Sequence, residues 1–215
     1  MPPQDPIPLF PLQLVLLPDM PLPLHIFEER YKLMAGDCLR DRKPFGIVYY
    51  DGSDIQRVGC TALITHVLNR YEDGRLDILA SGKDRFQIGE FVEGKPFLEA
   101  KVEYFKDREE AVDGDLINLG RAAVRELEKL ALFTGEVFDG AALSRLTLEN
   151  LSFVVASAEG ITLEEKQRFL EMTMTRDRLK EGTGSLKNLT VRLYWKSQLK
   201  RFFGNEDPAS GTNHL

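Results

Sequence analysis

The pattern of apolar and polar residues changes its period near residue 106, which predicts strands before that point and helices after it. In the first part, short apolar runs are bounded by glycine, proline or aspartate, as is typical of β-strands. The predicted strands are residues 45–50, 58–68, 76–80, 86–91 and 98–105. Asp73-Gly74 predicts a hairpin turn, Ser81-Gly82 a second turn, and Gly59 a bend or bulge. Short strands at this spacing favour a small closed or half-closed β-barrel.

The first 31 residues differ from the rest because prolines interrupt their apolar runs. These prolines include Pro8, Pro11, Pro18, Pro21 and Pro23. Proline cannot donate a ladder hydrogen bond, so residues 7–12 are predicted to form an edge strand or a short strand at best. The later prolines keep the chain extended, as a strap of fixed shape. From Ile26 onward, apolar residues return at helical spacing behind the acidic pair Glu28 and Glu29, which predicts a helix start.

Beyond residue 106 the apolar residues recur with the period of an α-helix. The charged stretch 106–114 comes first, and helical stripes follow in residues 116–130 and 143–157. Thr162 and Glu165 have the spacing of a capping box, which predicts a helix start at Leu163. Residues 182–184 predict a break, after which Ser185 caps a last helix that Gly204 ends. We therefore predict three parts: residues 1–106, residues 107–204, and a disordered tail over residues 205–215.

Composition places the chain among globular proteins with an ample core, since 43% of its 215 residues are hydrophobic. The net charge of -6 argues against general nucleic-acid binding, which needs a basic surface. No apolar run is long enough to span a membrane, and the start lacks the pattern of a signal peptide. We therefore expect a cytoplasmic protein without membrane contact, in which Cys38 and Cys60 are reduced and buried.

Several ordered motifs run through both parts of the chain. They are Pro8-Leu9-Phe10-Pro11-Leu12, Leu17-Pro18, Ile26-Phe27-Glu28-x-Arg30-Tyr31, Phe45-Gly46-Ile47-Val48, Ser81-Gly82-x-x-Arg85-Phe86 and Glu165-Lys166-Gln167-Arg168-Phe169-Leu170-Glu171. Together they resemble the amino-terminal, substrate-binding domain of the Lon protease family, over roughly residues 5–200. Asp19 stands where that family often has glycine. The resemblance implies an α+β fold in which a PUA-like β-barrel precedes a helical bundle.

Motifs for catalysis are missing from the sequence. The chain has no Gly-x-x-x-x-Gly-Lys-Ser/Thr phosphate loop and no Gly-x-Ser-x-Gly elbow, whereas a complete Lon protease carries an ATPase and a Ser-Lys peptidase module. His25, His66 and His214 are far apart and show no metal-ligand spacing. We therefore expect a protein that is not an enzyme, with no catalytic residue, no metal site and no cofactor.

The resemblance implies recognition of exposed apolar segments of polypeptide, which would need a groove or an open sheet edge. Candidate peptide-binding residues lie in the first 31 positions: Leu9, Phe10, Leu17, Met20, Phe27, Arg30 and Tyr31. Glu28, Arg30 and Arg85 also stand beside core-like aromatic residues. They either form a partly buried ion pair that fixes the strap to the barrel or belong to the binding surface.

The last predicted helix, residues 186–203, carries basic residues and no acid. Leu186, Leu189 and Leu193 form one apolar stripe, and Val191, Trp195, Leu199 and Phe202 form another. Either the helix packs against other helices and exposes a basic face, or it contacts a partner, an acidic segment or a second copy of the chain. The candidate partner-binding residues are Arg192, Trp195, Lys196 and Leu199.

The function that these patterns favour is recognition of unfolded or apolar polypeptide by a non-catalytic protein. Such a protein would act as an adaptor or regulator in protein quality control, and self-association is left open. The alternative is an RNA-binding PUA-like module that uses the basic last helix. The acidic net charge makes nucleic acid the less favoured partner.

Overall fold

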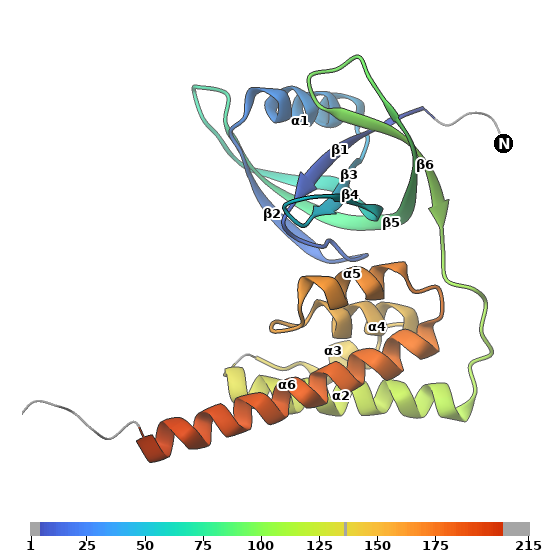
Figure 1. The fold of residues 1–215 in the computed structure, drawn as a ribbon, viewed down its shortest axis with the longest axis vertical. Coiled ribbons are helices and arrows are strands. Elements are labelled where there is room, and N and C mark those ends of the chain that lie inside the picture. The colour runs from blue at the N-terminus through green and yellow to red at the C-terminus, as the bar shows by residue number, and fades with distance from the viewer. Residues whose placement is uncertain (1–4, 136, 204–215) are drawn as a thin grey trace, which may run out of the picture.

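The computed structural model describes residues 5–135 and 137–203, which form a strand-rich part followed by a helical part (Figure 1). The strands are β1 (Ile7–Leu12), β2 (Pro21–Ile26), β3 (Phe45–Tyr50), β4 (Ile55–Arg70), β5 (Leu76–Val92) and β6 (Leu98–Phe105). The helices are α1 (Glu29–Asp41), α2 (Gly114–Thr134), α3 (Gly140–Leu143), α4 (Leu148–Ser157), α5 (Leu163–Glu171) and α6 (Thr175–Phe203). The α+β class is therefore confirmed. Gly204 and the predicted tail lie outside the described residues.

The sheet closes on itself through its longest strand. Its order is β2-β5-β4-β3-β1-β6, and β5 also pairs with β6. The second half of β5 makes this pairing, from Arg85 to Val92, while β2 lies along the first half, from Leu76 to Ser81. The hydrogen-bonded ring thus contains β5, β4, β3, β1 and β6, and β2 lies outside it as an edge strand.

Strand β1 is one of the strands of this ring, so of the two predicted alternatives, an edge strand or a short strand, the structure shows the short strand, with six residues. It pairs in parallel with β3 over residues 9–12 and antiparallel with β6 over residues 7–9. Apart from Leu9, each residue of β1 therefore has a partner on one side only. That arrangement tolerates Pro8 and Pro11, which have no N–H to give to a second neighbour.

Ser81-Gly82, predicted as a turn, lies within the continuous strand β5. The backbone of the strap crosses here, because Gly82 N–H donates to Met20 O at 2.9 Å and Asp19 N–H donates to Gly82 O at 3.1 Å. A Cβ on Gly82 would come within 2.2 Å of Leu17 O, so close backbone approach explains the glycine. Asp19 has φ +61, a conformation that glycine adopts more easily. The turn predicted at Asp73-Gly74 is confirmed, with φ +84 at Gly74.

Helix α6 is continuous over its 29 residues, so the break predicted at residues 182–184 is wrong. Gly182 is buried against Val155 of α4, where an added Cβ would meet Val155 Cγ1 at 2.7 Å. Ser185 is an interior residue, not a helix cap, and its hydroxyl donates to Glu165 at 2.7 Å. The capping box at Thr162 and Glu165 is confirmed. In Figure 1 the C-terminal end of α6 extends past the other helices.

A single hydrophobic core runs from the sheet into the helices. It joins strand residues such as Phe45 and Ile78 to helix residues such as Leu116, Phe153 and Phe169. A smaller cluster gathers around Phe86 inside the strand-rich part. Gly46 and Gly59 make room for that ring, since a Cβ on either would meet it at 2.6 Å. Gly59 is thus a packing position within the paired part of β4.

Candidate functional site

Four of the seven predicted peptide-binding residues lie in the core of the structure. Leu9, Phe10, Leu17 and Tyr31 are all less than one-tenth exposed. The rings of Phe10 and Tyr31 stack at a centroid distance of 4.0 Å, so the apolar pattern of the strap reflects packing. A bound peptide cannot reach these side chains without opening the core.

The other three predicted residues reach the surface. Phe27 is 59% exposed, Met20 is half-buried, and Arg30 is exposed. Arg30 donates from Nε to Glu28 at 2.9 Å, and its guanidinium lies 4.6 Å from the centre of the Tyr31 ring. This ion pair is therefore a surface pair that covers a core aromatic ring, and it does not involve Arg85.

Arg85 instead belongs to a buried ionic network between the strands and the helices. Its guanidinium donates to Asp107, to Leu170 O at 3.0 Å and to Met172 O. Arg178 of α6 pairs with the same carboxylate and donates to Ser152 Oγ at 2.7 Å. The side chains of Arg85, Asp107 and Arg178 are 3%, 7% and 0% exposed. This network joins β5, the segment after β6, and α6, so it fixes the helices to the sheet.

The pKa values in the network follow from burial and from these contacts. Burial lowers the pKa of Arg85, although the Asp107 charge opposes that effect. Burial alone would raise the pKa of Asp107. Hydrogen bonds from Arg178 and Thr175, together with the charges of both arginines, bring it below its ordinary value. Phe153 packs against the guanidinium of Arg178, with its ring centre 3.9 Å away.

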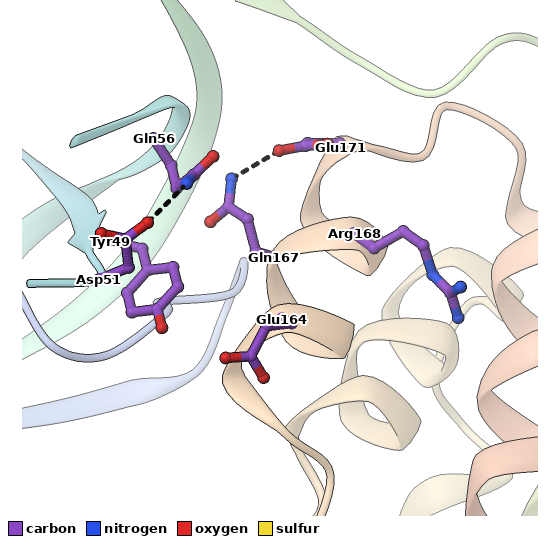
Figure 2. Close-up of a pocket in the computed structure, with 7 residues that line it drawn as sticks. All are labelled: Tyr49, Asp51, Gln56, Glu164, Gln167, Arg168 and Glu171. Atoms are coloured by element: carbon purple, nitrogen blue, oxygen red, sulfur yellow. Dashed lines mark hydrogen bonds between the residues drawn. The ribbon is translucent and has the colours of Figure 1, made fainter. Parts of the chain in front are cut away.

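A polar cleft lies where α5 faces the β3–β4 connection (Figure 2). Its volume is about 280 Å³. Tyr49, Asp51 and Gln56 line the side of the sheet, and Glu164, Gln167, Arg168 and Glu171 line the side of α5. In the sequence, Gln167 and its neighbours stand out only as part of the Lon-like motif at residues 165–171. The tertiary contact that brings α5 against β4 is what makes them a site.

Gln167 forms the floor of this cleft, and one of its polar atoms has no partner. It is 6% exposed, and its Nε2 donates to Val58 O at 3.0 Å and to Glu171 Oε1 at 2.8 Å. Both of those neighbours are acceptors, which fixes the orientation of the amide. Its Oε1 is buried and accepts no hydrogen bond from the described residues. The cleft therefore presents an unused acceptor.

The charge in the cleft is negative. Asp51 accepts hydrogen bonds from the backbone of Asp54 and Ser53, which lower its pKa to about 2 and keep it ionised. Glu164 forms no ion pair with any residue that the structure describes. The lining cation, Arg168, pairs at 2.9 Å with Glu181, which is not a lining residue. In Figure 2 its guanidinium points away from Tyr49 and Gln56.

The predicted partner-binding residues lie on the far end of α6 and are exposed. Trp195 and Leu199 are 60% and 54% exposed, and Arg192 and Lys196 are exposed as well. Val191 and Phe202 continue the same apolar stripe, which is exposed along its length. Leu186 and Leu189 are buried. The helix thus packs by one stripe and leaves the other uncovered, as the sequence allowed.

The remaining features concern metal ions, membranes and thiols, within residues 5–135 and 137–203. No group of three or more His, Cys, Asp or Glu side chains there could hold a metal ion. None of the helices in those ranges has the length and apolar character needed to cross a membrane. Cys38 and Cys60 are free and buried, as predicted, and burial raises the pKa of Cys60 to about 12. Such a thiol is a packing group.

Comparison with known proteins decides the family. The model of the ATP-dependent protease La (LON) substrate-binding domain matches residues 6–188, which covers both the strand-rich and the helical part. The chain belongs to the Lon substrate-binding domain family. The resemblance drawn from the sequence motifs is thereby confirmed.

Lon proteases from several bacteria are similar to this Lon-type domain along most of its length. The protease of Dictyoglomus thermophilum is 25% identical over 191 residues, which cover 82% of this chain and 24% of the protease. The Lon protease of Anaeromyxobacter dehalogenans is 26% identical over 190 residues, which cover 81% of this chain and 22% of that protease. The chain thus spans about a quarter of the length of these curated relatives.

Solved structures of Lon amino-terminal domains share the fold. The N-terminal domain of the Mycobacterium avium complex Lon protease matches with a TM-score of 0.69 at 19% identity, covering 85% of this chain and 98% of that one. A Lon N-terminal domain protein from Xanthomonas campestris matches with a TM-score of 0.65 at 21% identity, and the match covers 83% of this chain and 96% of that one. These likenesses establish the fold of the Lon-type domain.

Proposed function

We propose that this protein recognises unfolded or apolar segments of polypeptide and is not itself an enzyme. The observation that carries the proposal is the family match over residues 6–188, because the matched family is a substrate-binding domain. In this proposal the ring of strands is PUA-like, and residues 1–106 and 107–204 are its two parts. The protein acts in the cytoplasm, as an adaptor or regulator in protein quality control.

The peptide-binding surface that we propose is formed by side chains. Strand β2 is the edge strand of the sheet, yet Pro21 and Pro23 alternate along it. The N–H groups between the prolines are needed for pairing with β5, so the outer edge offers few donors to an added strand. Phe27, Met20 and Arg30 therefore remain as the predicted contacts that a peptide can reach.

The test is fluorescence anisotropy with a labelled, permanently unfolded polypeptide, and with a labelled folded protein and a labelled RNA as controls. We expect saturable binding to the unfolded chain alone. Phe27→Asp should weaken that binding about tenfold, the effect of losing about 1.4 kcal/mol. Leu132→Asp changes a residue of α2 that is 81% exposed and serves as the matched control. Binding to RNA alone would support the PUA-like RNA-binding alternative instead.

The exposed stripe of α6 favours a second interaction. Val191, Trp195, Leu199 and Phe202 are spaced as the contact stripe of a packed helix pair, with Arg192 and Lys196 beside them. Residues 186–203 contain no acid, so two copies of this helix would bring like charges together. The occupant that we propose is an amphipathic helix of a partner protein with acidic residues beside its apolar stripe.

This second interaction is tested with two designed helical peptides that share an apolar stripe and differ only in acidic or basic flanks. The acidic peptide should bind, and Trp195→Ala should weaken its binding. Self-association in sedimentation analysis that Trp195→Ala abolishes would replace the partner helix with a second copy. Binding to vesicles of anionic lipid but to neither peptide would assign the stripe to a membrane surface.

A further inference from the structure

We propose that the cleft between α5 and the β3–β4 connection binds a basic side chain, lysine or arginine, of the recognised polypeptide. This inference rests on the proposed function and names a chemical preference within it. Nothing in the apolar pattern of the chain suggests such a preference. The cleft supplies it through its shape, its unused acceptor and its charge.

The amide of Gln167 is buried and has one polar atom without a partner in the part of the chain that the structure describes. Its orientation is fixed by two acceptors at Nε2, so the unpartnered atom is Oε1. A buried acceptor without a donor has lost its hydrogen bonds to water and gained none in return, which is unfavourable. A ligand that brings an N–H group to this atom supplies the missing hydrogen bond, whereas a carboxylate or an apolar group does not. The ligand that fits is therefore a hydrogen-bond donor.

The charge around that amide is negative. Asp51, Glu164 and Glu171 line the cleft, and its arginine is paired elsewhere. Burial, and then the charges of Glu164 and Asp51, raise the pKa of Tyr49 in the same cleft. A donor that also carries positive charge gains from the same carboxylates. The ammonium of lysine and the guanidinium of arginine are the protein groups with both properties.

The size and the position of the cleft suit a single long side chain. A cleft of about 280 Å³ equals roughly nine water volumes, enough for one long side chain with some water but not for a folded segment. The cleft lies between the strand-rich part and α5, so the backbone of a bound chain would pass along this junction. The walls come from both parts, and Gln167 Nε2 ties them together at Val58 O.

The test compares two labelled unfolded peptides of identical sequence, one with lysine and one with acetyl-lysine at the same positions. Acetylation removes the positive charge, adds an acetyl group and leaves one N–H on Nζ, so the comparison measures the contribution of the charge. At physiological salt, we expect the native protein to bind the lysine peptide about tenfold more tightly, which corresponds to about 1.4 kcal/mol. Glu164→Gln and Glu171→Gln should bring the two affinities to within about twofold of each other.

Matched controls separate the cleft from the general negative charge of the protein. Glu93→Gln and Glu72→Gln remove the same charge at exposed positions that do not line the cleft. They should leave the tenfold preference unchanged, and circular dichroism should show that all four variants are folded. If the controls lower the preference as much as Glu164→Gln does, long-range charge explains it and the assignment fails.

The remaining outcomes distinguish this inference from the function on which it rests. Saturable and equal binding of both peptides would overturn the cleft assignment and leave polypeptide recognition standing. Binding of neither peptide would overturn both. Calorimetric titration with spermidine alone tests a free polyamine as the source of the cation. Tight spermidine binding that Glu164→Gln abolishes, without any peptide preference, would assign the cleft to a polyamine instead.

Discussion

Asp107 shows at the scale of single residues how this fold handles buried charge. One carboxylate receives hydrogen bonds from Arg85, Arg178 and Thr175. The two arginines also donate to main-chain carbonyl groups, Arg85 to Leu170 O and Arg178 to Met172 O, and these dipoles help to stabilise the second positive charge. The network depends most on Asp107, because this carboxylate is the counterion of both buried guanidinium groups.

Replacing Asp107 with asparagine should therefore destabilise the protein strongly. Two buried guanidinium groups lose their counterion, a change that typically lowers the free energy of unfolding by about 3–5 kcal/mol. Chemical denaturation followed by circular dichroism measures the loss. Asp37→Asn, which removes a surface partner of Arg40, should have a much smaller effect. Equal effects of the two variants would contradict the structural role given to the network.

The same carboxylate should make stability depend on pH in the acid range. The folded-state pKa of Asp107 is lowered, so its contribution is fully present above the unfolded-state pKa, about 3.9. It is lost as pH falls through the folded-state value. Unfolding curves between pH 7 and pH 2 should show a smaller decline for Asp107→Asn than for the native protein. Parallel curves would show that Asp107 does not titrate as described.

The sequence singles out Arg85, as part of an ion pair at the strap or of a binding surface, but it does not reveal the partner of Arg85. Its placement beside Phe86 suggested an ion pair near the strap, whereas its contacts lie 22, 85 and 87 residues further along the chain. Local spacing carries no information about such pairs. Phe10 and Phe27 show the same limit for the candidate site, since one apolar residue packs in the core and the other is exposed. Only the fold separates a core residue from a contact residue.

At the scale of elements, α6 continues through two glycines that locally favour a helix break. Gly182-Thr183-Gly184 has the composition of a break, but burial against α4 holds the helix together there. Helix propensity is a weak preference that tertiary packing often overrides. The capping box of α5 could be predicted because its hydrogen bonds join residues three apart. The path of α6 could not, because it depends on Val155.

The two glycines should respond to alanine in opposite directions. An added Cβ at Gly184 meets nothing within 4 Å, so Gly184→Ala should stabilise the protein by up to about 1 kcal/mol through helix propensity. At Gly182 the same Cβ would lie 2.7 Å from Val155 Cγ1, so Gly182→Ala should destabilise it. Thermal and chemical unfolding of both variants measures the difference. The same sign at both positions would contradict the packing described for α6.

At the scale of the whole molecule, the strand-rich and helical parts should unfold together. One core cluster includes Phe45 from the sheet and Phe153 from the helices, and the network at Asp107 joins the same two parts. We expect one transition in scanning calorimetry, with equal calorimetric and van't Hoff enthalpies. Two resolved transitions would show that residues 1–106 and 107–204 are independent domains, as the change of period alone suggests.

Helix α6 connects the two candidate surfaces, because it begins beside the cleft and carries the exposed stripe towards its C-terminal end. Thr175 and Arg178 hold its base in the ionic network, four residues after Glu171 at the cleft. Phe202 lies 24 residues beyond Arg178, about 36 Å away at 1.5 Å per residue. A tilt of about 5° at the base therefore moves the tip by about 3 Å. Small adjustments beside the cleft would be geometrically amplified at the exposed stripe of α6.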